Sequence, residues 1–355
     1  MSNSGANGRL ILFLGADWWG SDARALAVAL RQRGHSLIEV QYEEFFPLHW
    51  SSFPLKVVRR FIRPWCATNY NQAVAHYLGN PAIDFVLVFK GMILRPETLA
   101  AFRHRHIPLY CFYPDVSFGA HGSNIANCLV HYDCVFTTKE FHLRDQQWRS
   151  RLQDIKLVRH GFDPEVHRPI QMTAAVRQHY ECDVSFVGCW SPKKEHLVEA
   201  LIAGLPSVQL RLWGPGWDRA PGTRRFWTGR GAYGDELAII YQCSKINLGL
   251  LSEQATDTTS GDQTTVRTWQ IPASGGFMLH EATAELAQSL EPGKEVATFE
   301  NAVDLPGLVQ QYLAQPEARA RIAAAGRQRC VSGQYTYSAA AELICSYHAN
   351  RKQIL

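Results

Sequence analysis

The chain has 355 residues, of which 46% are hydrophobic and 19% are charged, and its formal net charge is +4. This composition is typical of a folded globular protein rather than a disordered one, and so small a charge gives no reason to expect nucleic-acid binding. The length suits two domains of ordinary size.

No apolar run is long enough to span a bilayer, and residues 1–9 lack the apolar core of a signal peptide. The nine cysteines are scattered, odd in number and without a C-x-x-C pair, so neither a zinc site nor a disulfide framework is expected. We therefore expect a cytoplasmic protein.

The first half of the chain predicts alternating strands and helices. An apolar run at 9–14 ends at Gly15, and a helix follows over 22–33, ending at Gly34. Further buried strands are expected at 36–40, 85–89, 109–113, 134–137 and 155–159. This alternation predicts a parallel sheet covered on both faces.

A glycine and two prolines between 160 and 169 indicate a linker, so we expect domains at 1–168 and 169–335 and a C-terminal helix, 336–355, that crosses back to the first domain. The second half repeats the pattern. Strands are expected at 184–187, 210–213, 246–250 and 277–279, and helices at 193–203, 234–243, 264–273 and 305–327. Both domains are therefore expected to be Rossmann-like, doubly wound α/β folds.

The segment RTWQIPASGGFMLHE, residues 267–281, predicts a helix that stops at Gly275 and Gly276 and leads into a strand. Thr264 and Thr265 would begin this helix and offer backbone N–H groups to a diphosphate. Arg267 adds a positive charge, and Gln270 could reach sugar hydroxyls. The alternative is an ordinary joint between a helix and a strand.

This segment resembles the signature of the CgeB-like glycosyltransferases, the spore-maturation-protein family, whose usual form is close to R-T-F-E-I-P-A-C-G-G-F-M-L-T-E. Other segments resemble the family in the same order: HGFDPEVHRP at 160–169, CDVSFVGCW at 182–190, LRLWGPGW at 210–217, YQCSKINLGL at 241–250, PGKEVATFENAVDL at 292–305 and YLAQPEARARIAAAGRQRC at 312–330. The resemblance implies the GT-B architecture, with two Rossmann-like domains facing a central cleft. It implies a nucleotide diphosphate sugar as co-substrate and no tightly bound cofactor.

The resemblance also assigns donor-binding roles in the second domain. Glu281 matches the family's last glutamate and is a candidate partner for a sugar hydroxyl, whereas Gln270 stands where the family has Glu. In the glycine turn GCWSPKK, the candidates are Gly188, Lys193 and Lys194. Further candidates are Trp213 and Gly214 on the next turn and Tyr233 for stacking on the base. The alternatives are a solvated lysine pair and tryptophans packed in the domain.

The first domain is expected to bind the acceptor. Asp115 follows a buried strand and is the first candidate for general base if the sugar centre inverts, with His121 and Asp17 as weaker ones. Turn-forming aspartates are the alternative reading. The sequence contains no Asp-x-Asp pair, so we expect a metal-independent enzyme.

Residues 56–65 predict a basic amphipathic helix, with Val57, Val58, Phe61 and Ile62 on one side and Lys56, Arg59, Arg60 and Arg63 on the other. Such a helix either contacts an anionic membrane, as a peripheral protein would, or packs on its own domain.

The sequence thus predicts a glycosyltransferase that acts on a glycan, a lipid-linked acceptor or a small molecule. Two other functions stay open, a non-catalytic protein that binds nucleotide or glycan, and a nucleotide-sugar epimerase.

Overall fold

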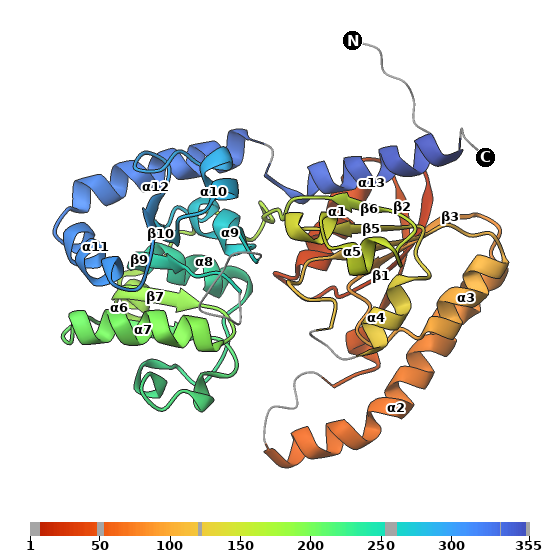
Figure 1. The fold of residues 1–355 in the computed structure, drawn as a ribbon, viewed down its shortest axis with the longest axis horizontal. Helices are drawn as coiled ribbons and strands as arrows, with labels where there is room; N and C mark the ends of the chain where they lie inside the picture. The colour runs from red at the N-terminus through yellow and green to blue at the C-terminus, as the bar shows by residue number, and fades with distance from the viewer. Residues whose placement is uncertain (1–7, 48–52, 120–122, 253–260, 334, 353–355) are drawn as a thin grey trace, which may run out of the picture. The chain divides into compact units, whose positions relative to one another are not determined.

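The computed structural model describes residues 8–47, 53–119, 123–252, 261–333 and 335–352 (Figure 1). The chain forms two compact units, the first made of residues 1–159 and 337–355 and the second of residues 160–336. The first division therefore falls after Arg159, earlier than the boundary expected after residue 168, and the chain re-enters the first unit at Tyr337.

The first unit is built on a six-stranded parallel sheet with the order β2-β1-β3-β4-β5-β6. Its strands are β1 (Leu10–Gly15), β2 (Ser36–Gln41), β3 (Ile83–Phe89), β4 (Leu109–Tyr113), β5 (Cys134–Thr137) and β6 (Ile155–Leu157). All five of the expected runs after β1 form strands, because near-continuous apolar runs suit a sheet that is buried on both faces.

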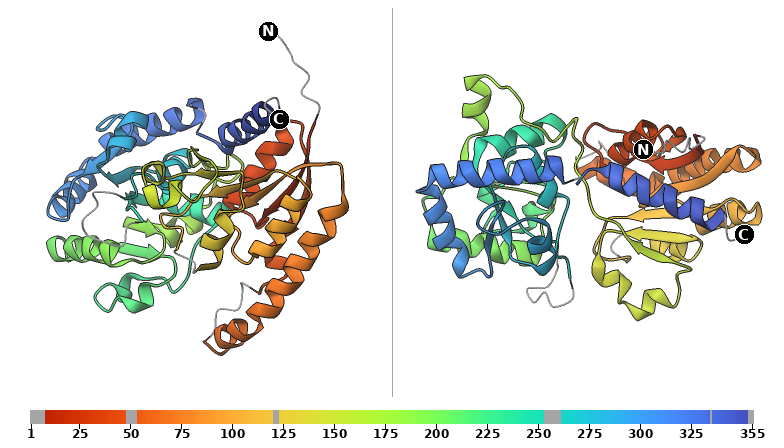
Figure 2. Two further views of the ribbon diagram at one scale, coloured as in Figure 1. Left: turned by 45° about the vertical axis from the view of Figure 1, so that its right-hand side comes forward. Right: turned by 90° about the horizontal axis from the view of Figure 1, so that it is seen from above.

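Helices cover both faces of this sheet (Figures 1 and 2). Leu12 and Leu14 pack with α2 (Phe53–Ala75), α3 (Pro96–His104) and α4 (Ser123–Leu129), whereas Ile11 and Phe13 face α1 (Asp22–Gln32) and α13 (Tyr337–Lys352). This division follows from the period of two along a strand. The short helix α5 (Gln146–Arg149) and the 3-10 turns η1 (Tyr42–Glu44), η2 (His76–Gly79) and η3 (Glu140–Leu143) complete the unit.

Helix α1 shows why the predicted boundaries hold. The Ser21 hydroxyl accepts the Ala23 N–H at 3.2 Å, and Asp22 lies in the first turn, where a negative charge favours the helix dipole. The helix ends before Gly34, whose φ of +85° is readily adopted only by glycine.

The second unit is built on a five-stranded parallel sheet with the order β11-β10-β9-β7-β8. Its strands are β7 (Cys182–Val187), β8 (Leu210–Trp213), β9 (Ser244–Gly249), β10 (Met278–Glu281) and β11 (Ala297–Phe299). Helices α7 (Pro192–Gly204) and α11 (Asp304–Leu313) cover one face, while α8 (Gly234–Cys243), α9 (Arg267–Ala273) and α10 (Ala284–Ser289) cover the other.

Helix α12 (Pro316–Ser332) contributes to both faces, and α6 (Ala174–Tyr180) precedes the sheet. Two 3-10 turns follow β8, η4 (Trp217–Arg219) and η5 (Arg224–Phe226). Two expected boundaries were wrong. The single helix predicted over 305–327 is two helices, because Pro316 has no N–H to donate and forces Gln315 out of the helical conformation. The helix predicted over 264–273 begins at Arg267.

Each sheet is doubly wound and has one switch point, where the strand order reverses. In the first unit this point lies between β1 and β3, and in the second between β7 and β9. Open parallel sheets bind ligands beyond the carboxyl ends of the strands at such points. None of the helices within the described ranges is long and apolar enough to cross a membrane.

Candidate functional site

Arg267 spans the switch point of the second unit. Its Nη2 atom donates to the Leu250 carbonyl at 2.6 Å, just beyond the end of β9. A Cβ placed on Gly188, just beyond β7, would lie 2.8 Å from its Nη1 atom. The glycine turn therefore leaves room for a guanidinium between the two central strand ends.

Lys194 brings a second buried cation to the same edge. Ser191 caps α7, and its hydroxyl accepts the Lys194 N–H at 3.5 Å. The Lys194 ammonium then reaches back and donates to the Cys189 carbonyl at 3.0 Å. Burial, followed by the nearby Arg267 charge, lowers the pKa of Lys194 to about 7.

Lys193 and Glu281 form an ion pair close by. The Lys193 ammonium lies 2.6 Å from Oε2 of Glu281, with angles outside the hydrogen-bond range, while Oε1 accepts the Leu251 N–H at 2.6 Å. Buried Asp262 accepts the Ser252 N–H at 3.0 Å. Within the described part of the chain, three cations and two carboxylates therefore meet at this edge, and positive charge exceeds negative charge among them when Lys194 is protonated.

Gly188 and Gly214 approach each other through their backbones. A Cβ on Gly214 would lie 2.1 Å from the Gly188 carbonyl oxygen, and Gly214 has a φ of +123°. Trp217 Nε1 donates to the same carbonyl at 3.0 Å. Glycine at 214 is required by this contact, which sets the position of the turn after β7.

The two aromatic candidates, Trp213 and Tyr233, differ in how far they are buried. The Trp213 side chain is buried in the core with Val187 and Trp269, so its contribution is packing. Tyr233 caps α8 and is 58% exposed, with its ring against Gly231. An exposed aromatic ring of this kind has the flat apolar surface on which a base can stack.

The threonines before α9 are already engaged. The Thr265 N–H, expected to be open to a diphosphate, donates to Thr268 Oγ1 at 3.0 Å, and Thr264 Oγ1 donates to Glu285 at 3.1 Å. The loop is therefore held by hydrogen bonds among its own residues and to Glu285, and a donor-binding role for these two threonines stays a prediction.

Helix α9 contains Gln270 at its middle and is followed by Gly275 and Gly276. Gln270 is buried within the helix. Gly275 has a φ of +84°, and a Cβ on Gly276 would lie 2.7 Å from the Tyr241 carbonyl oxygen. Both glycines precede β10, at the amino end of the sheet, so they reverse the chain at the edge opposite Arg267.

In the first unit, Asp115 is held in an ion pair. Its Oδ2 atom lies 2.6 Å from the Lys90 ammonium, and Lys90, just beyond β3, has a φ of +68°. Such a backbone is strained for a residue with a side chain, and strain of this kind occurs often at functional sites.

The loop that carries Asp115 is fixed by hydrogen bonds from its neighbours. Thr138 Oγ1 donates to the Pro114 carbonyl at 3.1 Å, and the Tyr113 hydroxyl donates to the Ser117 carbonyl at 2.6 Å. Asp17, beyond β1, has its carboxylate 3.6 Å from Arg24. His121 lies outside the residues that the structure describes.

Comparison with known proteins identifies the fold. The chain superposes on sucrose-phosphate synthase from Thermosynechococcus elongatus with a TM-score of 0.68 and 14% identity, over 98% of this chain and 100% of that one. It superposes on Anabaena HepE in complex with UDP-glucose with a TM-score of 0.63 and 12% identity, over 98% and 100% of the two chains. A glycosyltransferase from Rickettsia africae gives 0.62 and 12%, over 97% and 99%.

A family model described as glycosyl transferase-like matches residues 192–346. This range includes α7, α9 and the charged side chains beyond the ends of β7 and β9. The chain is a glycosyltransferase with the GT-B fold. The expected architecture of two Rossmann-like domains is thereby confirmed. No sequence among the curated proteins matches the chain.

Two contacts near the candidate site residues were not predicted. One is the Lys90–Asp115 ion pair, and the other is the hydrogen bond between the buried side chain of His280 and Thr268. His280 Nδ1 donates to the Glu281 carbonyl at 2.7 Å, so Nε2 accepts from Thr268 Oγ1 at 2.9 Å. The signal in the sequence was that His280 stands where the family signature has Thr.

The residues that the structure describes include no group of three or more His, Cys, Asp or Glu side chains placed to hold a metal ion. Metal independence remains a prediction. The feature of the site that relates to it is the positive charge of Lys193, Lys194 and Arg267, which could neutralise a diphosphate in place of a metal ion.

Proposed function

We propose that this glycosyltransferase transfers a sugar from a nucleotide diphosphate sugar, bound by the second unit, to an acceptor bound by the first, and that it is CgeB-like. The observation that carries the proposal is the pair of buried cations, Lys194 and Arg267, at the switch point of the second sheet. A buried cation is costly unless an anion compensates it, and a diphosphate would supply that anion.

The chemistry follows from the same charges. When the bond between sugar and diphosphate breaks, negative charge develops on the leaving phosphate oxygen. Lys194 and Arg267 would stabilise that charge without a metal ion, since preorganised donors need little rearrangement during the reaction. The ordered CgeB-like segments and the missing Asp-x-Asp pair support the same metal-independent assignment.

Gln270 and Glu281 are the proposed contacts to the sugar and ribose hydroxyls. Glu281 is held by Lys193 and by the Leu251 N–H, which fixes its orientation. Gln270 offers one acceptor and two donors where a carboxylate offers only acceptors. Restoring Glu at this position, Gln270→Glu, would strengthen the donor complex if a ribose hydroxyl donates there.

In the first unit, Asp115 is the proposed general base for an inverting transfer, with Asp17 and His121 as further candidates. Lys90 holds the Asp115 carboxylate in place. A retaining transfer would need no protein base. The proposed acceptor is a glycan, a lipid-linked molecule or a small molecule, and the proposed location is the cytoplasm, including the inner face of the membrane.

The test is calorimetric titration with UDP, followed by incubation with UDP-sugars and detection of released UDP. Wild-type protein is expected to bind UDP and to release it from a UDP-sugar, and Arg267→Ala is expected to lose both. Lys245→Ala is the matched control, because Lys245 pairs with Asp183 on the sheet away from the cluster. UDP binding without any turnover would instead favour the non-catalytic protein, and conversion of the donor sugar alone would favour the epimerase.

A further inference from the structure

A cavity of about 530 Å³ lies in the first unit, at the carboxyl end of its sheet. Tyr42 and Phe46 follow β2, Met92 and Ile93 follow β3, and the remaining wall comes from α2. Met92 lies two positions after Lys90, whose ammonium holds the candidate base. The cavity therefore shares the loop after β3 with the proposed acceptor site.

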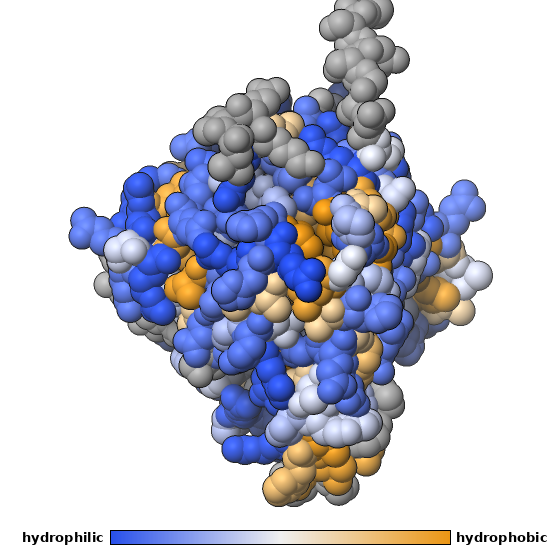
Figure 3. All heavy atoms as spheres, turned by 90° about the vertical axis from the view of Figure 1, so that its right-hand side faces the viewer, coloured by the Kyte–Doolittle hydropathy of each residue, from blue (hydrophilic) through white to orange (hydrophobic). Residues whose placement is uncertain are grey.

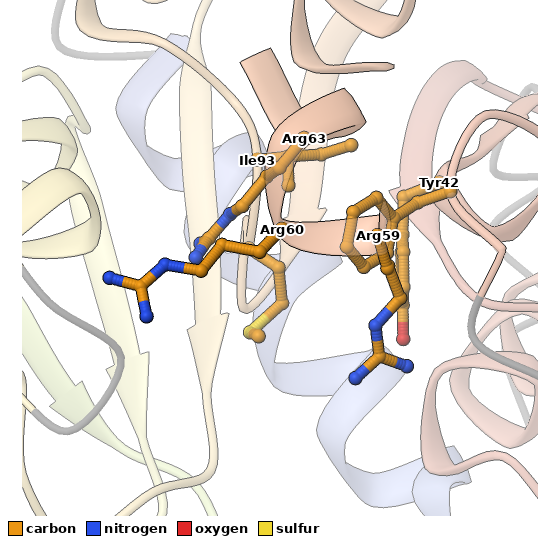
Figure 4. A pocket seen from close by; sticks show the side chains of 7 residues that line it. Tyr42, Arg59, Arg60, Arg63 and Ile93 are labelled. Carbon is orange, nitrogen blue, oxygen red and sulfur yellow. The ribbon is translucent and has the colours of Figure 1, made fainter. Parts of the chain in front are cut away.

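The charged side chains that the structure describes in the lining of this cavity are all basic. They are Arg59, Arg60 and Arg63, and the described lining contains no carboxylate. Figure 4 shows Arg60 and Arg63 extending to the same side of α2, with Arg59 beside Tyr42. Arg59 also lies over the Phe46 ring, 5.8 Å from its centroid, which orients the guanidinium.

Tyr42 adds a neutral donor. Burial, followed by the Glu43 charge, raises the pKa of its phenol to about 12, so the hydroxyl keeps its proton at neutral pH. Guanidinium groups bind phosphate oxygens through pairs of parallel hydrogen bonds. Three arginines and a protonated phenol around one cavity are therefore suited to a phosphate group.

Helix α2 also carries an exposed apolar row. Val57, Phe61 and Trp65 follow one another at i, i+4 and i+8 and are 41%, 78% and 67% exposed. The start of α2 projects from its unit in Figure 1, and orange side chains gather at the lower end of the face shown in Figure 3. The apolar side of this helix thus faces outward, contrary to the alternative in which it packs on its own domain.

We propose that the arginine cavity binds the phosphate head group of a lipid while the apolar row of α2 enters the surface of an anionic bilayer. One surface, an anionic membrane, supplies both the phosphate and the apolar layer that these two features require. A soluble phosphate would bind Arg60 and Arg63 but would leave Phe61 and Trp65 in water. This assignment deepens the proposed function, because it makes the acceptor lipid-linked.

The experiment measures cosedimentation of the full chain with vesicles of phosphatidylcholine, with and without phosphatidylglycerol. Wild-type protein is expected to bind the mixed vesicles and to dissociate as salt rises. Arg60→Ala with Arg63→Ala is expected to lower the partition coefficient by about tenfold or more. The double variant Phe61→Ser with Trp65→Ser is also expected to have a lower partition coefficient. Its loss relative to wild type should be the same at low and at high salt, because salt does not screen apolar contacts.

The matched control is Arg144→Ala with Arg149→Ala, which removes the same charge from exposed positions near α5. This control is expected to bind vesicles as wild type does. Equal binding by the Arg60 and Arg63 variant and the wild type, or equal binding to both kinds of vesicle, would overturn the proposal. Displacement by inorganic phosphate that chloride of the same ionic strength does not reproduce would assign the cavity to a free phosphate.

Titration with UDP on the same preparations separates the two proposals. The α2 variants are expected to bind UDP as the wild type does, which also shows that they are folded. Vesicle binding without UDP binding would contradict the proposed function alone, and UDP binding without vesicle binding would contradict the lipid site alone.

Discussion

The Lys194 ammonium and the Arg267 guanidinium lie over the ring of Phe186, 5.8 and 5.1 Å from its centroid. An aromatic face attracts each cation, and this attraction offsets part of their mutual repulsion. The ring therefore helps to hold the Arg267 charge and a protonated Lys194 close together before any anion arrives. The first three predictions follow from this arrangement.

The affinity for UDP should depend on pH through Lys194. A bound diphosphate raises the pKa of Lys194 from about 7, so the complex takes up a proton. Above pH 7 the affinity should fall, by up to about tenfold for each pH unit. Calorimetric titrations between pH 7 and pH 9 measure this, and Lys194→Arg should show a flatter profile. A flat wild-type profile would contradict the role of Lys194.

Lys194→Met should stabilise the protein while it abolishes UDP binding. Because burial lowers the pKa of Lys194, the unfolded chain holds this proton more strongly from about pH 7 up to the ordinary lysine pKa. The free energy of unfolding should therefore rise with pH across this window in wild type. At pH 7 and below we expect the variant to be more stable by on the order of 2 kcal/mol, measured by urea unfolding. A less stable variant would show that Lys194 is already compensated in the free protein.

Gly188→Ala should weaken UDP binding, because the new Cβ would lie 2.7 Å from Phe186 Cζ and 2.8 Å from Arg267 Nη1. Both groups must shift, so we expect a loss of about tenfold or more in affinity. Gly307→Ala is the matched control, since a Cβ there meets no atom within 4 Å. It should bind UDP normally and be as stable as wild type or slightly more so. Equal UDP affinity in the two variants would mean that the turn does not shape the site.

Asp115→Asn should lower kcat by about 10²–10⁴-fold and leave UDP binding unchanged, since a general base acts on the acceptor and not on the donor. Steady-state kinetics with a working acceptor measure this, and Asp17→Asn serves as the comparison. An unchanged kcat in Asp115→Asn would remove Asp115 from the role.

His280→Ala should destabilise the second unit. Burial lowers the pKa of His280, so the ring is neutral and its Nε2 atom accepts a hydrogen bond from the Thr268 hydroxyl, while Thr268 Oγ1 accepts one from the Thr265 N–H. Removing the ring leaves a cavity and a buried hydroxyl without its acceptor, which together cost about 2–4 kcal/mol. Thermal unfolding with and without UDP is the measurement. His280→Thr, the residue of the family signature, should recover part of the loss, and equal stability of all three proteins would contradict this account.

Much of the fold could be predicted because its signals are local. Buried strands such as β3 and β4 are continuous apolar runs, and Ser21 and Ser191 are recognisable helix caps. Pro316 is also a local signal, because proline favours the start of a helix, but the single helix predicted over 305–327 ignored it. Short-range patterns therefore predicted which elements form more reliably than where they end.

The candidate site could be predicted only in part because its contacts are long-range. A glycine turn points to Lys194 and the segment 267–281 points to Arg267, but no spacing along the chain indicates that both side chains lie over the ring of Phe186. The Lys90–Asp115 pair joins loops after two different strands, so no spacing along the chain reveals it. The apolar side of α2 was expected from its periodicity, whereas its exposure depends on what the rest of the unit leaves uncovered.

The return of α13 to the first unit has a consequence for synthesis. Tyr337, Ala340, Ala341 and Ile344 complete the core on one face of the first sheet, so the first unit lacks part of its interior until the last helix has been translated. The second unit is continuous from 160 to 336 and contains all of its own strands. Because domains generally fold as units, we expect the second unit to be able to fold during synthesis before α13 is available to complete the first.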